Sequence, residues 1–309
     1  MRIGHGWSML RDMEPTALRS FSEVCRRGSI SAAAQALGYT QSAVSRQIAA
    51  LESRLGAPLF ERHARGIRPT PAGEALLDHA IAILRRIESA EQDVAAALSR
   101  SVTHLRVGAV PSVTAALVPQ ALSRFVADSP GARVTFAEDV SPRLVPQALD
   151  GELDVVVVTD YPPGIPAHTD LELTHLIDDP LVCVLPKGHP LSGRERVDLA
   201  DLSAETWVED YEGAASVLSL ACARAGFTPR MDIACGSWLG KQAFVAAGHG
   251  VMLAPRSLLP ALRRDLAVRE LADPPVRRVF AAVRRRPPSA AASAAEMFVR
   301  ALMKVAAEA

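Results

Sequence analysis

The sequence predicts an α/β protein in three parts: a small helical module ending in a β-hairpin, one long helix, and a two-lobed α/β region. Two short helical patterns on either side of Gly38 indicate the first part. A seven-residue apolar repeat from Pro71 to about Leu98 indicates the second, and alternating strand and helix patterns from His104 onward indicate the third. With 309 residues, 49% hydrophobic and 22% charged, the chain suits two or three globular domains.

The first part, residues 14–71, begins with a helix over 16–27 whose apolar residues share one face. Ser31 is the expected N-cap of a second helix, and Gly38, which tolerates a positive φ, supplies the turn after it. Thr40 then caps a third helix with an apolar stripe. The opposite face of this third helix carries polar side chains close to its start, at Gln41, Ser42, Ser45 and Arg46.

This arrangement favours a helix-turn-helix DNA reader, because amide and guanidinium groups at the start of its second helix reach base edges in the major groove. On its own, the pattern fits an alanine-rich helical hairpin with solvated arginines almost as well. The next segment favours DNA: two short extended runs around residues 64–66 predict a wing whose arginines contact phosphates or a minor groove. Those arginines are Arg62, Arg65 and Arg68, and Ser31 is also expected to contact DNA.

The charge of the first part supports nucleic-acid binding. Residues 15–71 hold eight arginines and three glutamates, a net charge of 8 − 3 = +5, while the whole chain has a net charge of zero. A basic N-terminal module on a neutral chain is typical of a nucleic-acid reader joined to a second function.

A long helix, residues 72–100, follows the module. Its apolar residues alternate in steps of four and three, which is the seam of a coiled coil. An amphipathic helix lying on its own domain would show a similar pattern, but the length and the charged flank favour a partner helix from a second copy. The seam consists of Leu76, Ala80, Ile83, Ile87, Ala90, Val94 and Ala97.

The C-terminal region, residues 104–309, alternates strands and helices, which predicts a parallel, doubly wound sheet. Its first helix is expected over 112–127, and the all-apolar run VVVV suits a central strand buried on both faces. Three prolines and a glycine in 160–166 indicate a crossover into a second α/β unit. We expect the chain to return near 266–268, so that lobe I is residues 104–160 and 268–309, lobe II is residues 166–266, and a last helix covers 290–307.

Several runs of residues resemble one protein family. The run AAAQALGYTQSAVSRQIAALESRLGAPLFER, then TPAGEALL, resembles the N-terminal winged helix of LysR-type transcriptional regulators. The runs ALDGELDVVV, LPKGHPL and AAGHGVMLAP are similar to landmarks of that family's effector domain, so the resemblance covers about residues 13–309. The family's N-terminus usually resembles MEPTALRSF, which starts here at Met13, so residues 1–13 are expected to be a disordered extension.

The resemblance implies a DNA-binding regulator with a winged helix-turn-helix, a linker helix and a two-lobed, periplasmic-binding-protein-like effector domain. The implied partners are double-stranded DNA, a small organic effector between the lobes, and other copies of the chain, as a homodimer through the linker helix and as a homotetramer. No membrane partner and no cofactor is expected. The expected compartment is the cytoplasm, since the first residues lack the apolar stretch of a secretory signal.

The cleft between the two lobes is the expected effector site, because clefts between domains commonly bind small ligands. Ser112, Val113 and Thr114 open the first helix of lobe I, where free amides suit a carboxylate. At Thr159, some relatives that bind aromatic acids have an arginine, so the charge of the effector stays open. Each of these residues could equally be an ordinary cap or loop residue. Family correspondence adds Asp139, Val140, Thr159, Tyr211, Glu212, Ser237 and Trp238.

Other chemistry has less support in the sequence. GSWLGKQ, residues 236–242, resembles a phosphate loop but is one residue short and lacks the Ser/Thr that binds magnesium, so a capped helix is favoured. No catalytic or metal-ligand motif stands out, and the segment 209–215, where peroxide-sensing relatives place a reactive cysteine, has none. The alternative is an enzyme or a solute-binding protein built on the two lobes, which would need a catalytic constellation or a secretion signal. The four cysteines, which form no CxxC pair, are Cys25, Cys183, Cys222 and Cys235.

Overall fold

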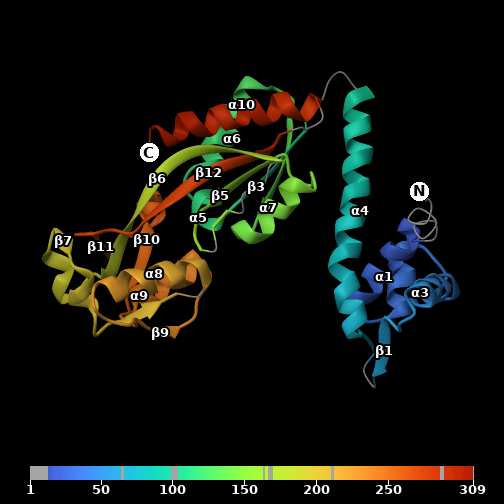
Figure 1. Cartoon of the computed structure of the whole chain (residues 1–309), viewed down its shortest axis with the longest axis horizontal. Helices are drawn as coiled ribbons and strands as arrows, with labels where there is room; N and C mark the ends of the chain where they lie inside the picture. Colours follow the sequence, from blue (N-terminus) through green and yellow to red (C-terminus); the bar gives the residue numbers. More distant parts are fainter. Residues whose placement is uncertain are drawn as a thin grey trace, which may run out of the picture. The chain divides into compact units, whose positions relative to one another are not determined.

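The computed structural model describes residues 13–63, 66–98, 104–162, 164–165, 170–209, 212–285 and 289–308. The chain forms two compact units, residues 1–94 and residues 95–309 (Figure 1). The expectations for the N-terminal extension, for Arg65 and for Tyr211 lie outside the described residues. Among the described residues, no helix is long and apolar enough to span a membrane.

The N-terminal unit packs three helices and a hairpin around a small apolar core. The apolar stripes of the helices meet there, with Phe21 stacked at a tilt on Phe60, their ring centroids 5.3 Å apart. Leu18, Val44 and Ile48 are buried in the same region. The elements are α1 (Pro15–Arg27), α2 (Ile30–Leu37), α3 (Gln41–Leu55), β1 (Phe60–His63) and β2 (Gly66–Pro69).

The start of α2 corrects one expectation. Ser29, not Ser31, is the N-cap: its hydroxyl accepts from the amide of Ala32 at 3.3 Å, while Ser31 lies exposed within the first turn. The helix starts earlier than predicted because Gly28, at φ 65°, ends α1 and lets the chain turn directly into α2. Thr40 caps α3 as predicted, accepting from the amide of Ala43.

The wing is fixed to the turn between α1 and α2. The amide of Ile67 donates to the carbonyl of Gly28 at 3.0 Å. Gly66 has φ 132°, and a Cβ at that position would lie 2.8 Å from the Gly28 carbonyl oxygen. Only glycine therefore lets β2 approach this turn so closely.

The long helix α4 (Pro71–Leu98) has two different environments along its length. Its first turns pack on the core of the N-terminal unit through Leu76, Ala80 and Leu84. Two later seam residues are exposed, Ile83 by 40% and Val94 by 60%. Both interpretations of the heptad pattern therefore apply, each to a different part of the helix.

The sheet of lobe I has the strand order β4-β3-β5-β12-β6. The first three strands are parallel, but β12 is antiparallel to both β5 and β6, so the sheet is mixed, not wholly parallel as expected. Helices α6 and α10 cover one face and α7 the other (Figure 1). The bounds are β3 (His104–Ala109), β4 (Arg133–Glu138), β5 (Val155–Thr159), β6 (Leu171–Pro186), β12 (Val276–Arg284), α6 (Val118–Asp128), α7 (Ser141–Leu149) and α10 (Ser289–Ala306).

The first helix of this region is shorter than expected. The predicted helix over 112–127 is broken into α5 (Pro111–Thr114) and α6, with a turn at 115–117 between them. Pro119 explains the break, because its ring provides no amide to continue a helix and it is tolerated in a first turn. The all-valine run of β5 is buried throughout, as predicted for a central strand.

Lobe II is built on the second half of β6. That half pairs with two antiparallel strands, and Trp207 and Val251 lie buried in the core beside it. The elements of lobe II are β7 (Arg196–Val197), β8 (Thr206–Val208), α8 (Glu212–Arg224), β9 (Arg230–Ile233), α9 (Trp238–Ala246), β10 (Met252–Pro255) and β11 (Leu266–Leu271), with short 3-10 turns at Pro190–Gly193, Leu199–Leu202 and Arg256–Ala261.

The two crossings between the lobes differ from those predicted. Residues 171–180 of β6 pair with β12 in lobe I, and residues 181–186 pair with β10 and β11 in lobe II. The chain thus crosses inside one long strand, β6, and not within the stretch at 160–166 as expected. The return lies between β11 and β12, after Leu271, since all of β11 that pairs with β6 belongs to lobe II.

The exposed seam of α4 generates a prediction. Replacing Ile83 and Ile87 together with aspartate should yield monomers in light scattering, because each charge would face its symmetry mate across an apolar seam. Arg85→Asp, on the other side of α4, changes the net charge by the same two units and should leave the oligomer intact. If the Ile83→Asp/Ile87→Asp chain keeps the wild-type mass, α4 is not the principal contact.

Candidate functional site

The polar start of α3 is turned outward by its buried face. Val44, Ile48 and Leu51 are buried against the neighbouring helices, so the other side of the helix is left to solvent. The hydroxyl of Ser20 on α1 also donates to the Gln47 side chain at 2.6 Å and fixes the two helices together. Of the predicted base-reading residues, Gln41, Ser42 and Arg46 are exposed and Ser45 is half-buried.

The predicted DNA contacts elsewhere are distributed over two elements. Ser31 is exposed in the first turn of α2, and Arg68 is exposed on β2. Arg62 pairs through its backbone with Ile67 in the hairpin. The structure therefore brings the start of α3 and a basic hairpin into the same small unit, which is the arrangement a winged helix presents to DNA.

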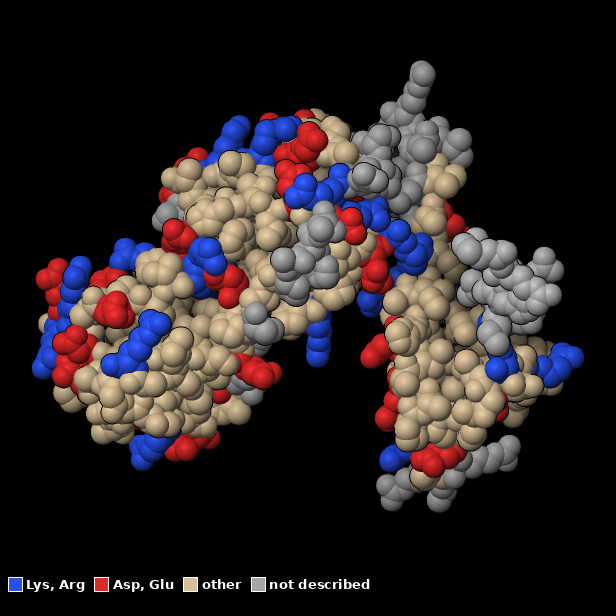
Figure 2. Space-filling view, viewed as in Figure 1, with Lys and Arg blue, Asp and Glu red and all other residues tan. Residues whose placement is uncertain are grey.

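A pocket of about 90 Å³ lies between the lobes of the C-terminal unit. On the face in Figure 2, basic and acidic side chains are interspersed over that unit. The lining residues are Val110, Pro111, Ser112, Val140, Thr159, Tyr161, Leu181, Glu209, Ala214, Leu218, Gly236, Trp238, Lys241, Leu253 and Arg277.

One side of the pocket is organised by Arg277 on β12, which is only 3% exposed. Its Nε and Nη2 donate to the Asp179 carboxylate at 3.1 and 2.8 Å, and its Nη1 donates to the Ser112 hydroxyl at 2.7 Å. Asp179 also accepts from the amide and the hydroxyl of Ser257 in lobe II. This network joins both lobes at the point where β6 crosses between them.

Tyr161 lies beside this network. Burial raises the pKa of its hydroxyl to about 12, although the Arg277 cation acts in the opposite direction. The guanidinium carbon of Arg277 is 5.7 Å from the centroid of the Tyr161 ring. The phenol is therefore a neutral hydrogen-bonding group at physiological pH.

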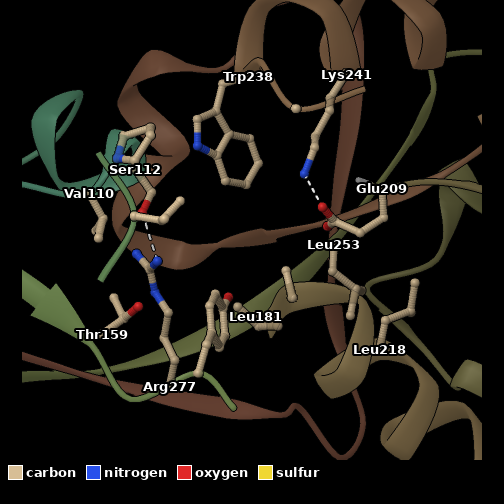
Figure 3. A pocket seen from close by; sticks show the side chains of 15 residues that line it. Val110, Ser112, Thr159, Leu181, Glu209, Leu218, Trp238, Lys241, Leu253 and Arg277 are labelled. Atoms are coloured by element: carbon tan, nitrogen blue, oxygen red, sulfur yellow. Dashed lines mark hydrogen bonds and ion pairs between the residues drawn. The ribbon is translucent and has the colours of Figure 1, made fainter. Parts of the chain in front are cut away.

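The other side of the pocket holds a second buried ion pair. Lys241 on α9 donates to the carboxylate of Glu209, and the side chains of both residues are at least nine-tenths buried. The ammonium also lies 4.9 Å from the centroid of the Trp238 ring, within range of a cation–π interaction. Figure 3 shows Arg277 with Ser112 on one side of the pocket and Lys241 with Glu209 on the other, with Trp238 and Leu181 between them and Leu253 next to Glu209. The site therefore has two polar ends and an apolar middle.

Four of the residues predicted for the effector site line this pocket: Ser112, Val140, Thr159 and Trp238. The remaining described ones do not. The amides of Val113 and Thr114 donate to the Val110 carbonyl, as does the Thr114 hydroxyl. Contrary to the expectation, these groups are therefore not available to a ligand.

The last three lie outside the lining for separate reasons. Asp139 accepts from the amide of Val140, Ser237 caps α9 by accepting from the amide of Gly240 at 3.0 Å, and Glu212 is exposed at the start of α8. Local capping therefore accounts for most of the predicted residues that the pocket excludes.

The charged groups of the pocket were not predicted from the sequence: Arg277, Lys241, Glu209, and the supporting Asp179. Two signals were present. Lys241 is three residues after Trp238, which places both on one helix face. Arg277 falls at an inward position of β12, where an unpaired charge would be costly and a buried partner is therefore required.

Comparison with known proteins identifies both units. The family model described as "Bacterial regulatory helix-turn-helix protein, lysR family" matches residues 15–74, and that described as "LysR substrate binding domain" matches residues 99–306. A probable hydrogen peroxide-inducible genes activator of Mycobacterium avium is 32% identical over 276 residues, 86% of this chain and 87% of that protein. The small neutral protease regulatory protein of Streptomyces coelicolor is 33% identical over 282 residues, 89% of this chain and 83% of that protein.

Solved structures give the same result for the fold. The structure of full-length CbnR complexed with its target DNA matches with a TM-score of 0.74 and 26% identity, and covers 94% of this chain and 100% of that one. An OxyR mutant of Corynebacterium glutamicum matches with a TM-score of 0.58 and 26% identity, and covers 96% and 94%. Both likenesses extend over nearly the whole chain.

The buried pair at one end of the pocket generates a prediction. Lys241→Met should lower the free energy of unfolding by about 3–5 kcal/mol, because the Glu209 carboxylate loses its cation in a buried site. The double variant Lys241→Met/Glu209→Gln should recover most of that loss. Urea unfolding followed by tryptophan fluorescence measures both.

A surface pair provides the control for that measurement. Arg194→Met removes the partner of Asp201 in an exposed ion pair and should cost less than about 1 kcal/mol. Equal losses for Arg194→Met and Lys241→Met would show that burial adds nothing to the role of the Lys241–Glu209 pair.

Proposed function

Since this chain belongs to the LysR family of transcriptional regulators, which combine a DNA-binding helix-turn-helix domain with an effector-binding domain, we propose specific roles for the residues of its two units. The winged helix-turn-helix domain is residues 14–71, the linker helix residues 72–100 and the effector domain residues 104–309. The family-model matches at 15–74 and 99–306 support these boundaries.

In the DNA-binding domain, the start of α3 reads the major groove. Gln41, Ser42, Ser45 and Arg46 supply the base contacts, and the side chains of the wing hold the backbone or a minor groove. The support is geometric: the buried stripe of α3 turns these polar residues outward, and the basic hairpin is anchored to the same unit at Gly28. The arginines of the wing are Arg62, Arg65 and Arg68.

The regulator assembles through α4 as a homodimer, and two dimers form a homotetramer. The support for the dimer is the exposed apolar seam at Ile83 and Val94. Two copies of α3 then meet successive major grooves on one side of a duplex, which is the geometry that a palindromic site requires. The compartment is the cytoplasm, where the DNA is, and the chain acts by binding and not by catalysis.

The effector is a small organic molecule bound in the pocket between the lobes. The single observation that supports this placement is that lining residues of both lobes meet around one cavity, so a bound molecule contacts both. Some relatives that bind aromatic acids have an arginine at the position of Thr159. In this chain, Arg277 supplies a cation to the pocket instead. A carboxylate or carbonyl oxygen of the effector fits the Arg277–Ser112 end, and its apolar part fits against Leu181, Leu253 and Trp238.

Binding of this effector is non-covalent in our proposal, although a similar protein is named a hydrogen peroxide-inducible activator. Burial raises the pKa of the Cys183 thiol to about 12 and that of Cys222 to about 11. The reactive thiolate is therefore suppressed in both residues. The segment 209–215, which lines part of the pocket, contains no cysteine.

A base-reading role for Arg46 predicts loss of specificity. Arg46→Ala should weaken binding to an operator selected from a random DNA library by about 1–3 kcal/mol, while binding to random duplex changes little. Arg19→Ala, an exposed arginine on α1, serves as the control for lost charge. Equal losses on operator and random duplex in fluorescence anisotropy would remove Arg46 from the base-reading set.

The effector pocket predicts a pattern across three variants. For metabolites that raise the melting temperature of the wild-type chain, Ser112→Ala and Thr159→Val should each weaken binding by about 0.5–1.5 kcal/mol in calorimetry. Thr114→Val is the matched control, because the Thr114 hydroxyl is bonded to its own helix and does not line the pocket. Hits that bind Ser112→Ala and Thr159→Val as tightly as wild type would place the effector elsewhere.

A further inference from the structure

We propose that the C-terminal end of α1 holds a second DNA contact, in which Arg26 and Arg27 bind a backbone phosphate together with Arg68 of the wing, and in which Glu23 weakens that contact. The proposal rests on DNA binding by the winged helix-turn-helix and adds residues of α1 to it. None of Arg26, Arg27 and Glu23 belongs to the reading face at α3.

The contact surface is a hollow of about 620 Å³ between α1 and the wing. Its lining combines the end of α1 with both strands of the hairpin and contains three arginines and a histidine but no acidic residue. A hollow lined only by cationic and neutral groups fits an anion. The lining residues are Cys25, Arg26, Arg27, Gly28, His63, Gly66, Ile67, Arg68 and Pro69.

The backbone fixes the shape of this hollow. The hydrogen bond from the Ile67 amide to the Gly28 carbonyl holds β2 against the end of α1, and the absence of a side chain at Gly66 allows the approach. Arg68 is therefore carried next to Arg26 and Arg27 by a rigid connection. Cations at the end of α1 are also favoured by its helix dipole.

The position of the hollow in the motif indicates which anion it meets. In a helix-turn-helix the first helix of the motif crosses the DNA backbone, and here that helix, α2, begins at Ile30, directly after the hollow. The wing, which forms the other wall, contacts phosphates or a minor groove when α3 is in the major groove. A backbone phosphate between these two contacts is the anion that this geometry offers.

Glu23 lies beneath the two arginines and pairs with both. Its carboxylate accepts from Nε and Nη2 of Arg26 at 2.9 and 2.5 Å, and from Nε of Arg27. These two side chains lower the pKa of Glu23 to about 2, so the carboxylate is charged at physiological pH. A phosphate must therefore compete with Glu23 for the same guanidinium groups, and removal of that competitor should strengthen DNA binding.

The test uses the full-length chain and a fluorescein-labelled random-sequence 30-base-pair duplex, because a phosphate contact is independent of sequence. Because the three arginines share one phosphate, the double variant Arg26→Ala/Arg27→Ala should reduce the slope of log K against log[KCl] by up to about 0.9 for each protomer in contact and weaken binding at 0.1 M salt about fivefold to tenfold. Each single variant should give part of that change. Glu23→Gln should tighten binding at 0.1 M salt by about the same factor. A residue that only stabilised the helix would not produce an increase in affinity.

Two matched controls are provided by the other end of α1. Arg19→Ala removes one exposed positive charge and Glu14→Gln one exposed negative charge, on the same helix but away from the hollow. The proposal is overturned if Arg26→Ala and Arg27→Ala leave the salt slope at the value of Arg19→Ala, or if Glu23→Gln binds no more tightly than Glu14→Gln. If the wild-type chain shows no salt-dependent binding to the duplex, the fault lies with DNA binding by the domain itself.

Discussion

The effector domain depends on one buried ion pair, Arg277 with Asp179. Asp179 lies where β6 leaves one lobe for the other, and its partners come from β12, from α5 through Arg277, and from Ser257 in lobe II. A buried carboxylate is stable only when its oxygens are bonded, and here both are. The crossing strand can therefore carry a charge through the core of the unit because residues of both lobes are arranged around it.

The same pair connects ligand binding to lobe geometry. Arg277 bonds Ser112 in lobe I while its partner Asp179 bonds lobe II, so a molecule that contacts Ser112 or Arg277 acts on a network that both lobes share. A ligand changes the balance of two arrangements only through its different affinity for each. The pocket lies where β6 crosses between the lobes, so a ligand bound there would contact the residues whose positions differ between two lobe arrangements. Lys241 and Glu209, at the far end of the pocket, pair with each other within lobe II.

The sequence predicted what short-range patterns determine and missed what distant partners determine. The stripe of α3, its Thr40 cap and the buried valines of β5 follow from periodicity and local hydrogen bonding. The run LVCVLP predicts a strand over residues 181–186, but the extension of β6 back to Leu171 was not predicted. Asp178-Asp179-Pro180 is typical of a turn, and the charge of Asp179 is accommodated there by Arg277, which is distant in sequence. Likewise, the proline content of 160–166 indicated a crossing that β6 itself provides. In the pocket, Ser112 was predicted from a helix start and Trp238 from family correspondence, whereas Arg277 required knowledge of strand neighbours.

Because α4 carries both packed residues and an exposed seam, the number of residues between them sets the angle between these two surfaces of the helix. Its first turns are part of the DNA-binding core through Ala80, and its exposed seam begins at Ile83, less than one turn later. Each residue of an α-helix adds a rotation of about 100°. An insertion or deletion of a single residue between these two surfaces would redirect one against the other, while substitutions there would not. The length of this short stretch is thus under tighter constraint than its composition.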